Sequence, residues 1–262
     1  PLAIDGPTMS IRRFGRDPLM LNDLVLLKSF TKEIGEIMIG IVKSKLNVII
    51  SGGTGSGKTT LLNCLSQSIP EEERIVTIED TSELQLHQEH VVSLESKPPT
   101  VEGAGEYTIR DLVKNALRMR PDRIIVGECR GLEALDMVQA MNTGHDGSMT
   151  TVHANSSLEV IERLELLMLM GAELPISSLH RQIASAIDVI IHIDRLPDGR
   201  RVVSQISEVT GVDPHTYDVK VADIFSRRGG MLQPTGYLPS FAESLVSKEL
   251  LDLEFLYSDR AV

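Results

Sequence analysis

The 262-residue chain has few cysteines, few aromatic residues and no tryptophan. Its two cysteines, Cys64 and Cys129, exclude a disulfide scaffold and a zinc site with four cysteine ligands. Only five Phe and four Tyr are present, so we expect a core built mainly of Ile, Leu, Val and Met. No apolar run reaches the ~18 residues that a membrane-spanning helix needs, and no signal-peptide pattern opens the sequence. We therefore expect a cytoplasmic location.

Positive charge is also scarce, with 26 Lys and Arg against 37 Asp and Glu and a net charge of −11. Such a chain is poorly suited to binding nucleic acid over a wide surface, or anionic lipid by electrostatics alone. Hydrophobic residues make up 42% and charged residues 24%, which is the composition of a globular protein. Because the sequence starts at Pro1 and not at Met, we expect an N-terminal part to be missing.

Short apolar, β-branched runs alternate with segments of helical spacing. Strands are expected at 46–51, 74–80, 91–96, 122–128, 148–154 and 188–194, and a hairpin around the Asp-Gly turn at 197–201. Helices are expected at 21–45, 58–68, 108–119, 132–141, 156–170 and 176–186. This alternation predicts an α/β fold with a mostly parallel sheet and helices on both faces.

The predicted domain organisation has three parts. Residues 1–20 hold the end of a truncated N-terminal domain and a linker, 21–225 form the main domain, and 226–262 form a C-terminal helical extension.

The most specific motif is GGTGSGKT at 52–59, which fits G-x-x-x-x-G-K-[ST] and lies between an expected strand and an expected helix. The glycines let backbone N–H groups turn inward around phosphates, and the helix N-terminus adds partial positive charge. Lys58 can reach the β- and γ-phosphates, and the Thr59 hydroxyl can coordinate Mg²⁺. ATP and Mg²⁺ are the expected ligands. The residues expected to contact the nucleotide are Gly53, Thr54, Gly55, Ser56, Gly57, Lys58, Thr59 and Thr60.

Carboxylates follow two of the expected strands. Glu128 ends the run DRIIVGE, and the segment TIEDTSE at 77–83 brings Glu79, Asp80 and Glu83. Carboxylates at the carboxyl ends of parallel strands can hold the Mg²⁺ shell or position a water for attack on the γ-phosphate. Thr59, Glu79 and Glu128 are the candidates for holding Mg²⁺. The residues alone do not decide which of Glu79, Glu83 and Glu128 activates the water.

Histidines and arginines supply further candidates. The stretch TGHDGSMTTVHA at 143–154 places His145 before and His153 after one strand, where they could sense the γ-phosphate or a neighbouring subunit. No cysteine or third histidine stands close by in the sequence, so no zinc site is expected. Arg120 precedes an expected strand, and Arg12 and Arg13 lie in the linker. An arginine from the same or a neighbouring subunit can neutralise the transferred phosphoryl group, worth ~10³–10⁵ in rate.

The order of these motifs resembles the hexameric ATPases that power type II and type IV secretion and type IV pili. The similarity covers about residues 8–215. It is carried by the phosphate loop, the acidic box from Ile78 to Glu83, the strand ending at Glu128, and the histidine box at 143–154. The stretch GECRGLEALDMVQAMNTGHDGSMTTVHAN at 127–155 is most similar to the tight-adherence (Flp/Tad) pilus assembly branch. Conjugative type IV secretion ATPases are close relatives with similar motifs.

The resemblance implies a RecA-like P-loop NTPase domain that follows a mobile N-terminal domain. It implies a homo-oligomer, a hexameric ring, that hydrolyses ATP and drives pilus assembly or protein secretion through an inner-membrane platform protein.

The resemblance also implies roles for single residues. Glu83 would activate the water and Glu128 would be the Walker B carboxylate. Arg120 would lie near the γ-phosphate. Basic linker residues would approach the nucleotide from outside the core, and these are Arg12 and Arg13. The histidine box would contain His145 and His153.

Other functions fit less well. A non-hydrolysing nucleotide switch that regulates such a ring is disfavoured because Glu83 and Glu128 are both present. A small-molecule kinase would need an Arg-rich lid, and a GTPase would need an N-K-x-D tetrad, and neither pattern occurs. The acidic composition gives DNA translocation little support. Pilus retraction is also less expected, because the stretch after Glu128 differs from that branch.

Overall fold

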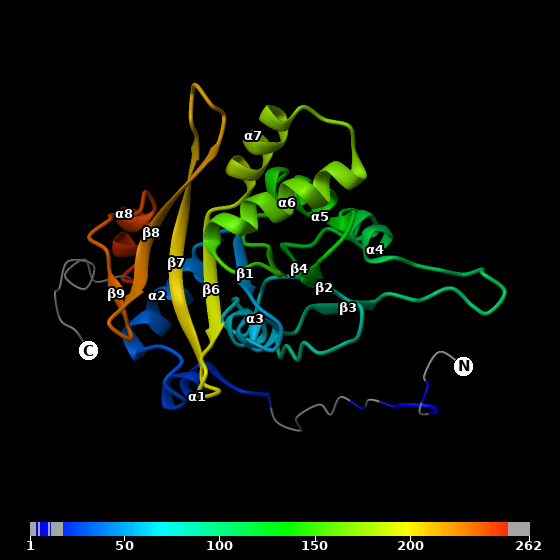
Figure 1. Ribbon diagram of the computed structural model, residues 1–262, viewed down its shortest axis with the longest axis horizontal. Coiled ribbons are helices and arrows are strands. Elements are labelled where there is room, and N and C mark those ends of the chain that lie inside the picture. The colour runs from blue at the N-terminus through cyan, green and yellow to red at the C-terminus, as the bar shows by residue number, and fades with distance from the viewer. Residues whose placement is uncertain (1–3, 5, 10, 12–17, 251–262) are drawn as a thin grey trace.

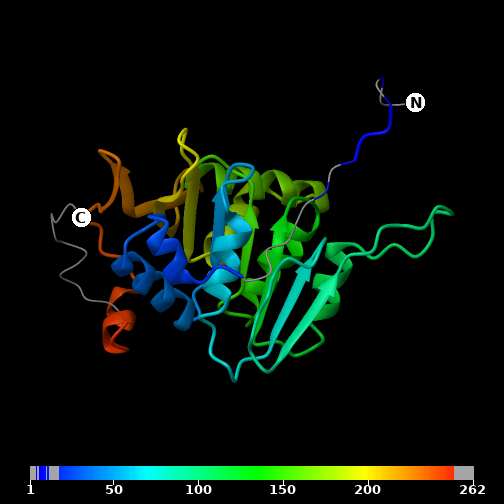
Figure 2. The ribbon, with the colours of Figure 1, turned by 90° about the horizontal axis from the view of Figure 1, so that it is seen from below.

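The structure is a computed structural model that describes residue 4, residues 6–9, residue 11 and residues 18–250. In this part of the chain a single sheet has helices on both faces (Figures 1 and 2). The strands are β1 (Val48–Gly52), β2 (Ile75–Glu79), β3 (Val91–Glu95), β4 (Arg123–Cys129), β5 (Met149–Val152), β6 (Val189–Arg195), β7 (Arg201–Val212), β8 (Val219–Arg228) and β9 (Met231–Pro234). The helices are α1 (Leu21–Leu26), α2 (Lys32–Lys43), α3 (Lys58–Ser66), α4 (Ile109–Ala116), α5 (Glu133–Asn142), α6 (Ser157–Gly171), α7 (Ile176–Ala186) and α8 (Ala242–Ser247).

The strand order is β3-β2-β4-β5-β1-β6-β7-β8-β9. The strands from β3 to β6 pair in parallel, and β7, β8 and β9 add to this sheet in antiparallel pairing. The predicted α/β fold with a mostly parallel sheet is therefore confirmed. The parallel strands all end at one edge of the sheet, called here the carboxyl edge, and begin at the opposite amino edge. Ligands of such sheets bind at the carboxyl edge.

The two faces of the sheet carry separate cores because side chains alternate along each strand. On β1, Val48 and Ile50 pack into one core with residues of α1, α2, α3 and α8. Ile49 packs into the other core with residues of α4, α5, α6 and α7. Among the described residues, no helix is long and apolar enough to cross a membrane.

The helix expected over residues 21–45 is in fact two helices. The chain leaves α1 through Lys28, whose φ of 59° is left-handed, and begins α2 at the N-cap Thr31. The Thr31 hydroxyl accepts a hydrogen bond from the Ile34 N–H, as an N-cap does. Leu24 and Phe30 are buried in the same core as α2, so the apolar spacing continues across the break and conceals it.

The sheet continues beyond the expected hairpin through β8 and β9. The expectation that residues 226–262 are helical is wrong for Met231–Pro234, which is strand β9, while α8 is a short helix as expected. Gly229 and Gly230 connect β8 to β9, and both have positive φ, 58° and 90°. Two-residue hairpin turns with positive φ at both positions favour Gly-Gly, so this dipeptide was the missed signal. The domain boundaries stay predictions.

The segment after β3 projects from the sheet as a narrow loop (Figures 1 and 2). Its ends are joined by an antiparallel bridge between Lys97 and Tyr107. The expected helix after it begins at the N-cap Thr108, whose hydroxyl and backbone N–H exchange hydrogen bonds with Asp111 in a capping box.

Candidate functional site

The glycine-rich loop between β1 and α3 lies at the carboxyl edge and is tightly built. A Cβ at Gly52 would stand 2.3 Å from the carbonyl oxygen of Ile193 and 2.5 Å from the hydroxyl of Ser56, so only glycine fits there. Gly57 is the N-cap of α3 in the left-handed conformation, with φ 101°. Lys58 Nζ donates to the carbonyl oxygens of Gly52 (3.0 Å) and Gly53 (3.1 Å). The loop therefore presents a helix N-terminus and a lysine at one place, an arrangement that binds phosphates.

Glu128 lies near the end of β4 and acts electrostatically on Lys58. Burial lowers the pKa of the Lys58 ammonium, and the negative charge of Glu128 opposes this effect. The neighbouring Gly127 is held by the Thr151 hydroxyl of β5, which donates to its carbonyl oxygen at 2.8 Å. The structure thus brings the phosphate-loop lysine and this predicted carboxylate together.

Glu79 ends β2 beside Glu128 and has a structural task. Its Oε1 accepts hydrogen bonds from the backbone N–H groups of Glu83 and Leu84, each at 3.0 Å. Its side chain packs against Gly127, where a Cβ would stand 3.1 Å from Glu79 Cγ. Burial raises the pKa of Glu79, and the two backbone hydrogen bonds partly offset this rise. Glu79 therefore shapes the turn that carries Glu83.

The rest of the acidic segment is anchored on both sides. Asp80 forms an ion pair with Arg130, which follows β4, and accepts a hydrogen bond from the Ser96 hydroxyl (2.8 Å). On the other side, the buried Asn63 of α3 accepts from the Gln85 N–H at 2.9 Å. These contacts tie the segment to the ends of β3 and β4 and to the helix that follows the phosphate loop.

The predicted Mg²⁺ ligands come from adjacent elements at this edge: Thr59 from α3, Glu79 from β2 and Glu128 from β4. Hydroxyl and carboxylate oxygens are a donor set suited to Mg²⁺. In the described part of the chain no group of three or more His, Cys, Asp or Glu side chains is arranged to hold a metal ion by itself. Mg²⁺ keeps waters and is usually bound by few protein groups together with substrate phosphates.

The two histidines of the 143–154 stretch lie at opposite edges of the sheet. His153 follows β5 at the carboxyl edge and is exposed. His145 precedes β5, and its carbonyl oxygen accepts from the Ser148 hydroxyl at 2.7 Å. Eight residues of extended chain span up to about 26 Å. Within one chain, His145 therefore lies at the edge opposite the phosphate loop, and a role for it at the nucleotide or at a neighbouring subunit stays a prediction.

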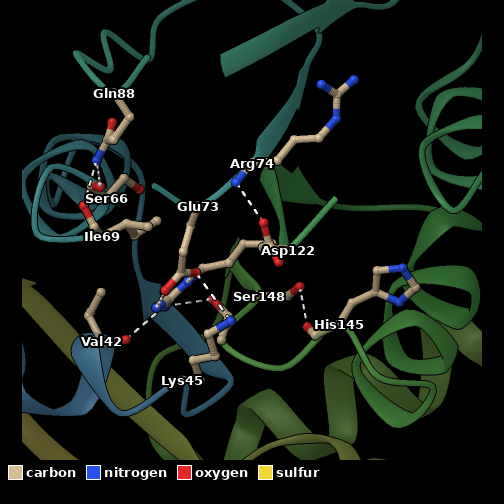
Figure 3. A network of polar contacts seen from close by, with 12 residues as sticks. Val42, Lys45, Ser66, Ile69, Glu73, Arg74, Gln88, Asp122, His145 and Ser148 are labelled. Carbon is tan, nitrogen blue, oxygen red and sulfur yellow. Dashed lines mark hydrogen bonds and ion pairs between the residues drawn. The ribbon is translucent and has the colours of Figure 1, made fainter. Parts of the chain in front are cut away.

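Arg120 also lies at the amino edge, because it precedes β4 by three residues. Near Arg120, at the start of β4, lies a network around a buried ion pair (Figure 3). Arg123 has no exposed surface and makes two hydrogen bonds to the Glu73 carboxylate, of 2.6 and 3.1 Å, and one to the Val42 carbonyl oxygen. Lys45 adds a second cation, 3.5 Å from Glu73. The structure does not bring Arg120 to the phosphate loop of its own chain. Two further predicted residues, Arg12 and Arg13, lie outside the described residues.

The β6–β7 hairpin supplies site residues that the sequence did not reveal. Arg201 Nε donates to the carbonyl oxygen of Gly55 at 3.0 Å, and Arg195 lies beside the same glycine. On β6, the buried His192 contacts the Ser51 hydroxyl of β1 through Nδ1 (2.8 Å), and burial lowers its pKa. The Asp-Gly turn predicted this hairpin. Only the pairing of β6 with β1 shows that the hairpin borders the loop.

A cavity of about 350 Å³ adjoins the loop. Gly57 and Thr60 form one wall of it. Leucines of α1 and its flanks form an apolar wall, and the hairpin turn closes the far side; these residues are Leu19, Leu24, Leu27, Asp198, Gly199, Arg200 and Arg201. Its volume lies in the range of small-molecule sites.

Comparison with known proteins places the chain in a family. The model of the type II/IV secretion system protein family matches residues 1–227, and the chain belongs to this family. The "Putative conjugal transfer protein" of Mycobacterium tuberculosis is 42% identical over 207 residues, which are 79% of this chain and 58% of the relative. Conjugal transfer protein TrbB of Rhizobium radiobacter is 40% identical over 205 residues, 77% of this chain and 60% of TrbB.

A solved structure supports the fold. The VirB11 ATPase of the Brucella suis type IV secretion system is 32% identical with a TM-score of 0.59, covering 79% of this chain and 62% of that chain. The chain thus spans about three fifths of the length of the three relatives named here. The predicted family is confirmed. These relatives belong to conjugal transfer and type IV secretion, so the narrower assignment to the tight-adherence branch stays a prediction.

Proposed function

We propose that this chain is the nucleotide-hydrolysing part of a motor that uses ATP and Mg²⁺ to energise type IV secretion or pilus assembly. The observation that carries the proposal is the convergence of Lys58, Glu79, Glu83 and Glu128 at the carboxyl edge of the parallel sheet. Family membership and the likeness to an ATPase of known structure support it.

The residues of the site divide the work of phosphoryl transfer. Backbone N–H groups of the loop from Gly53 to Thr60 would bind the phosphates, with Lys58 on the β- and γ-phosphates. Thr59 would hold Mg²⁺ together with the phosphates, and Glu128, near Lys58, would orient its water shell. Bound Mg²⁺ supplies positive charge that neutralises the phosphates.

Glu83 is our choice for activating the attacking water. The family resemblance gives this role to Glu83, and the two backbone hydrogen bonds accepted by Glu79 hold the Glu83 main chain in place. Glu83 would take a proton from the water while the water oxygen attacks the γ-phosphorus. The bond between that phosphorus and the β,γ-bridging oxygen then breaks, and ADP leaves with the electron pair.

The nucleoside part of ATP would bind in the cavity beside Thr60. Leucine side chains such as Leu24 and Leu27 offer an apolar surface for a base.

The amino-edge residues fit a ring of identical subunits, for which a hexamer is the proposal. Arg120 and His145 lie at the amino edge of the sheet, opposite the carboxyl edge that carries the phosphate loop of their own chain. If they act on nucleotide, they act on the nucleotide of a neighbouring subunit. We propose a cytoplasmic ring that contacts an inner-membrane platform protein, since a net charge of −11 disfavours binding to anionic lipid by electrostatics alone.

A binding and turnover experiment tests the proposal. Lys58→Ala is expected to weaken binding of a fluorescent ATP analogue by roughly tenfold or more, because a charge-assisted contact to the phosphates is lost. Glu128→Gln is expected to bind the analogue but not to hydrolyse ATP. Glu89→Gln, which removes an exposed carboxylate elsewhere, is the matched control. Equal binding by Lys58→Ala and the parent chain would contradict the proposal.

A genetic experiment distinguishes the branches. The 127–155 stretch resembles tight-adherence ATPases, whereas the relatives named above belong to conjugal transfer and type IV secretion. Deletion of the gene is expected to abolish either surface pili or substrate transfer to a recipient. The lost activity identifies the branch, and retention of both would exclude the proposed role.

A further inference from the structure

The β6–β7 hairpin places two arginines directly opposite one another. Arg195 on β6 and Arg201 on β7 are cross-strand partners in the antiparallel ladder. Side chains of directly opposite residues point to the same face of the sheet, within a few ångströms of each other. Like charges in this arrangement repel, so the pair is unfavourable unless an anion neutralises it.

The structure does not supply that anion from the chain itself. Among the described residues, neither Arg195 nor Arg201 forms an ion pair with a carboxylate. Arg200, the neighbour in the same hairpin, behaves differently and pairs with Asp198 at 2.7 Å. The hairpin thus satisfies one arginine internally and leaves two exposed guanidinium groups without an acidic partner.

Both unpaired arginines lie against the phosphate loop. Arg201 Nε donates to the Gly55 carbonyl oxygen at 3.0 Å, and its Cδ stands 3.1 Å from where a Cβ on Gly57 would be. Arg195 Nη1 lies 3.8 Å from the corresponding position on Gly55. A Cβ at Gly57 would crowd Arg201, whereas one at Gly55 would stand at ordinary contact distance from Arg195. The bond to Gly55 uses Nε, so the Nη groups of Arg201 are further donors on a side chain that lies beside the loop.

We propose that Arg195 and Arg201 form a polyphosphate clamp contributed by the same chain as the phosphate loop. The clamp binds the phosphate chain of the nucleotide from the side of the β6–β7 hairpin, and the bound phosphates relieve the repulsion between the two guanidinium groups. Guanidinium groups bind phosphate oxygens through paired N–H donors, which suits this task. This inference rests on the proposed nucleotide site and adds two phosphate ligands to it.

Binding of MgATP and of tripolyphosphate tests the clamp, with Arg195→Gln and Arg201→Gln as variants. Each variant is expected to bind both ligands between roughly tenfold and a hundredfold more weakly, because a charge-assisted contact is lost. Arg201→Lys, which keeps the charge, is expected to recover part of the affinity for tripolyphosphate. Arg181→Gln, which removes an exposed arginine of α7 away from the phosphate loop, is the matched control.

Thermal melting without nucleotide separates the clamp from a merely structural role. The melting comparison uses Arg195→Gln, because Arg201→Gln also loses the hydrogen bond to the Gly55 carbonyl oxygen. Removing Arg195 from the like-charge pair leaves the melting temperature unchanged or raises it, whereas loss of a structural contact lowers it. Affinities within twofold of the parent chain, or weaker binding with a lowered melting temperature, would overturn the inference. If the parent chain itself does not bind MgATP, the proposed function fails, which is a distinct result from failure of the clamp.

Discussion

The side chain of Glu79 holds the backbone of Glu83, with Glu79 Oε1 accepting the Glu83 N–H at 3.0 Å. A second bond, from the Leu84 N–H, completes the turn after β2. Two carboxylates that are indistinguishable in the sequence thus have different surroundings. Glu79 is buried and accepts two hydrogen bonds from the main chain, whereas Glu83 lies on the turn that the Glu79 side chain stabilises. Glu79 is a positioning residue.

Two substitutions of Glu79 separate the effect of its hydrogen bonds from the effect of its negative charge. Glu79→Ala removes the acceptor of two backbone N–H groups and is expected to lower kcat for ATP by roughly tenfold or more, with little change in KM. Glu79→Gln keeps an acceptor oxygen and is expected to stay within about threefold of the parent kcat. Steady-state kinetics check both values. Equal losses in the two variants would show that the charge, and not the hydrogen bonds, matters.

The pH dependence of stability tests the burial of the same group. Burial raises the pKa of Glu79 above its ordinary value of 4.5. The stability that the protonated Glu79 side chain contributes is therefore fully present below pH 4.5, and it is lost as the pH rises through the folded-state pKa. The free energy of unfolding of Glu79→Gln, relative to the parent chain, is therefore expected to increase from pH 4.5 upward. Urea unfolding between pH 4 and pH 8 measures it, with Glu89→Gln as the control for loss of one charge. A difference that does not change with pH would refute the prediction.

The buried pair of Arg123 and Glu73 is expected to matter for stability. Arg123→Met leaves the Glu73 carboxylate with only Lys45 nearby and is expected to cost about 3–5 kcal/mol in the free energy of unfolding. Urea denaturation measures this cost. The double variant Arg123→Met, Glu73→Met removes both buried charges and is expected to recover much of the loss. A single variant as stable as the parent chain would show that the pair contributes little.

Mixing experiments test whether Arg120 acts on a neighbouring subunit. Arg120→Ala is expected to reduce turnover by roughly 10³–10⁵, the range for an arginine that neutralises a transferred phosphoryl group. Lys58→Ala is expected to be inactive. Mixed in equal amounts, the two variants are expected to regain turnover, since some sites combine an intact phosphate loop with an intact neighbouring arginine. A mixture of Lys58→Ala and Glu128→Gln is the control, because both residues act in the same chain. If the mixture of Arg120→Ala and Lys58→Ala is no more active than either variant alone, a site shared between subunits is excluded.

The sequence predicted the parallel part of the fold because its signals are local. The buried β-branched runs, the phosphate-loop glycines and the Thr108 capping box each act within a few residues. The loop, Glu79, Glu83 and Glu128 lie at one edge because parallel strands end together.

The sequence could not predict what depends on register and strand length. His145 and His153 are close in sequence, but β5 separates them across the sheet. Arg195 and Arg201 are far from Gly55 in sequence and meet it only because β6 pairs with β1. The break between α1 and α2 was concealed because both helices contribute to one core.

Turnover measured against protein concentration tests the central claim most directly. We would measure ATP hydrolysis per subunit in the presence of Mg²⁺ over a wide range of concentration, with Glu128→Gln as the control. A ring motor with a shared site predicts that activity per subunit rises with concentration and vanishes in the variant. Nucleotide binding without turnover above that of Glu128→Gln, at every concentration, would contradict the account.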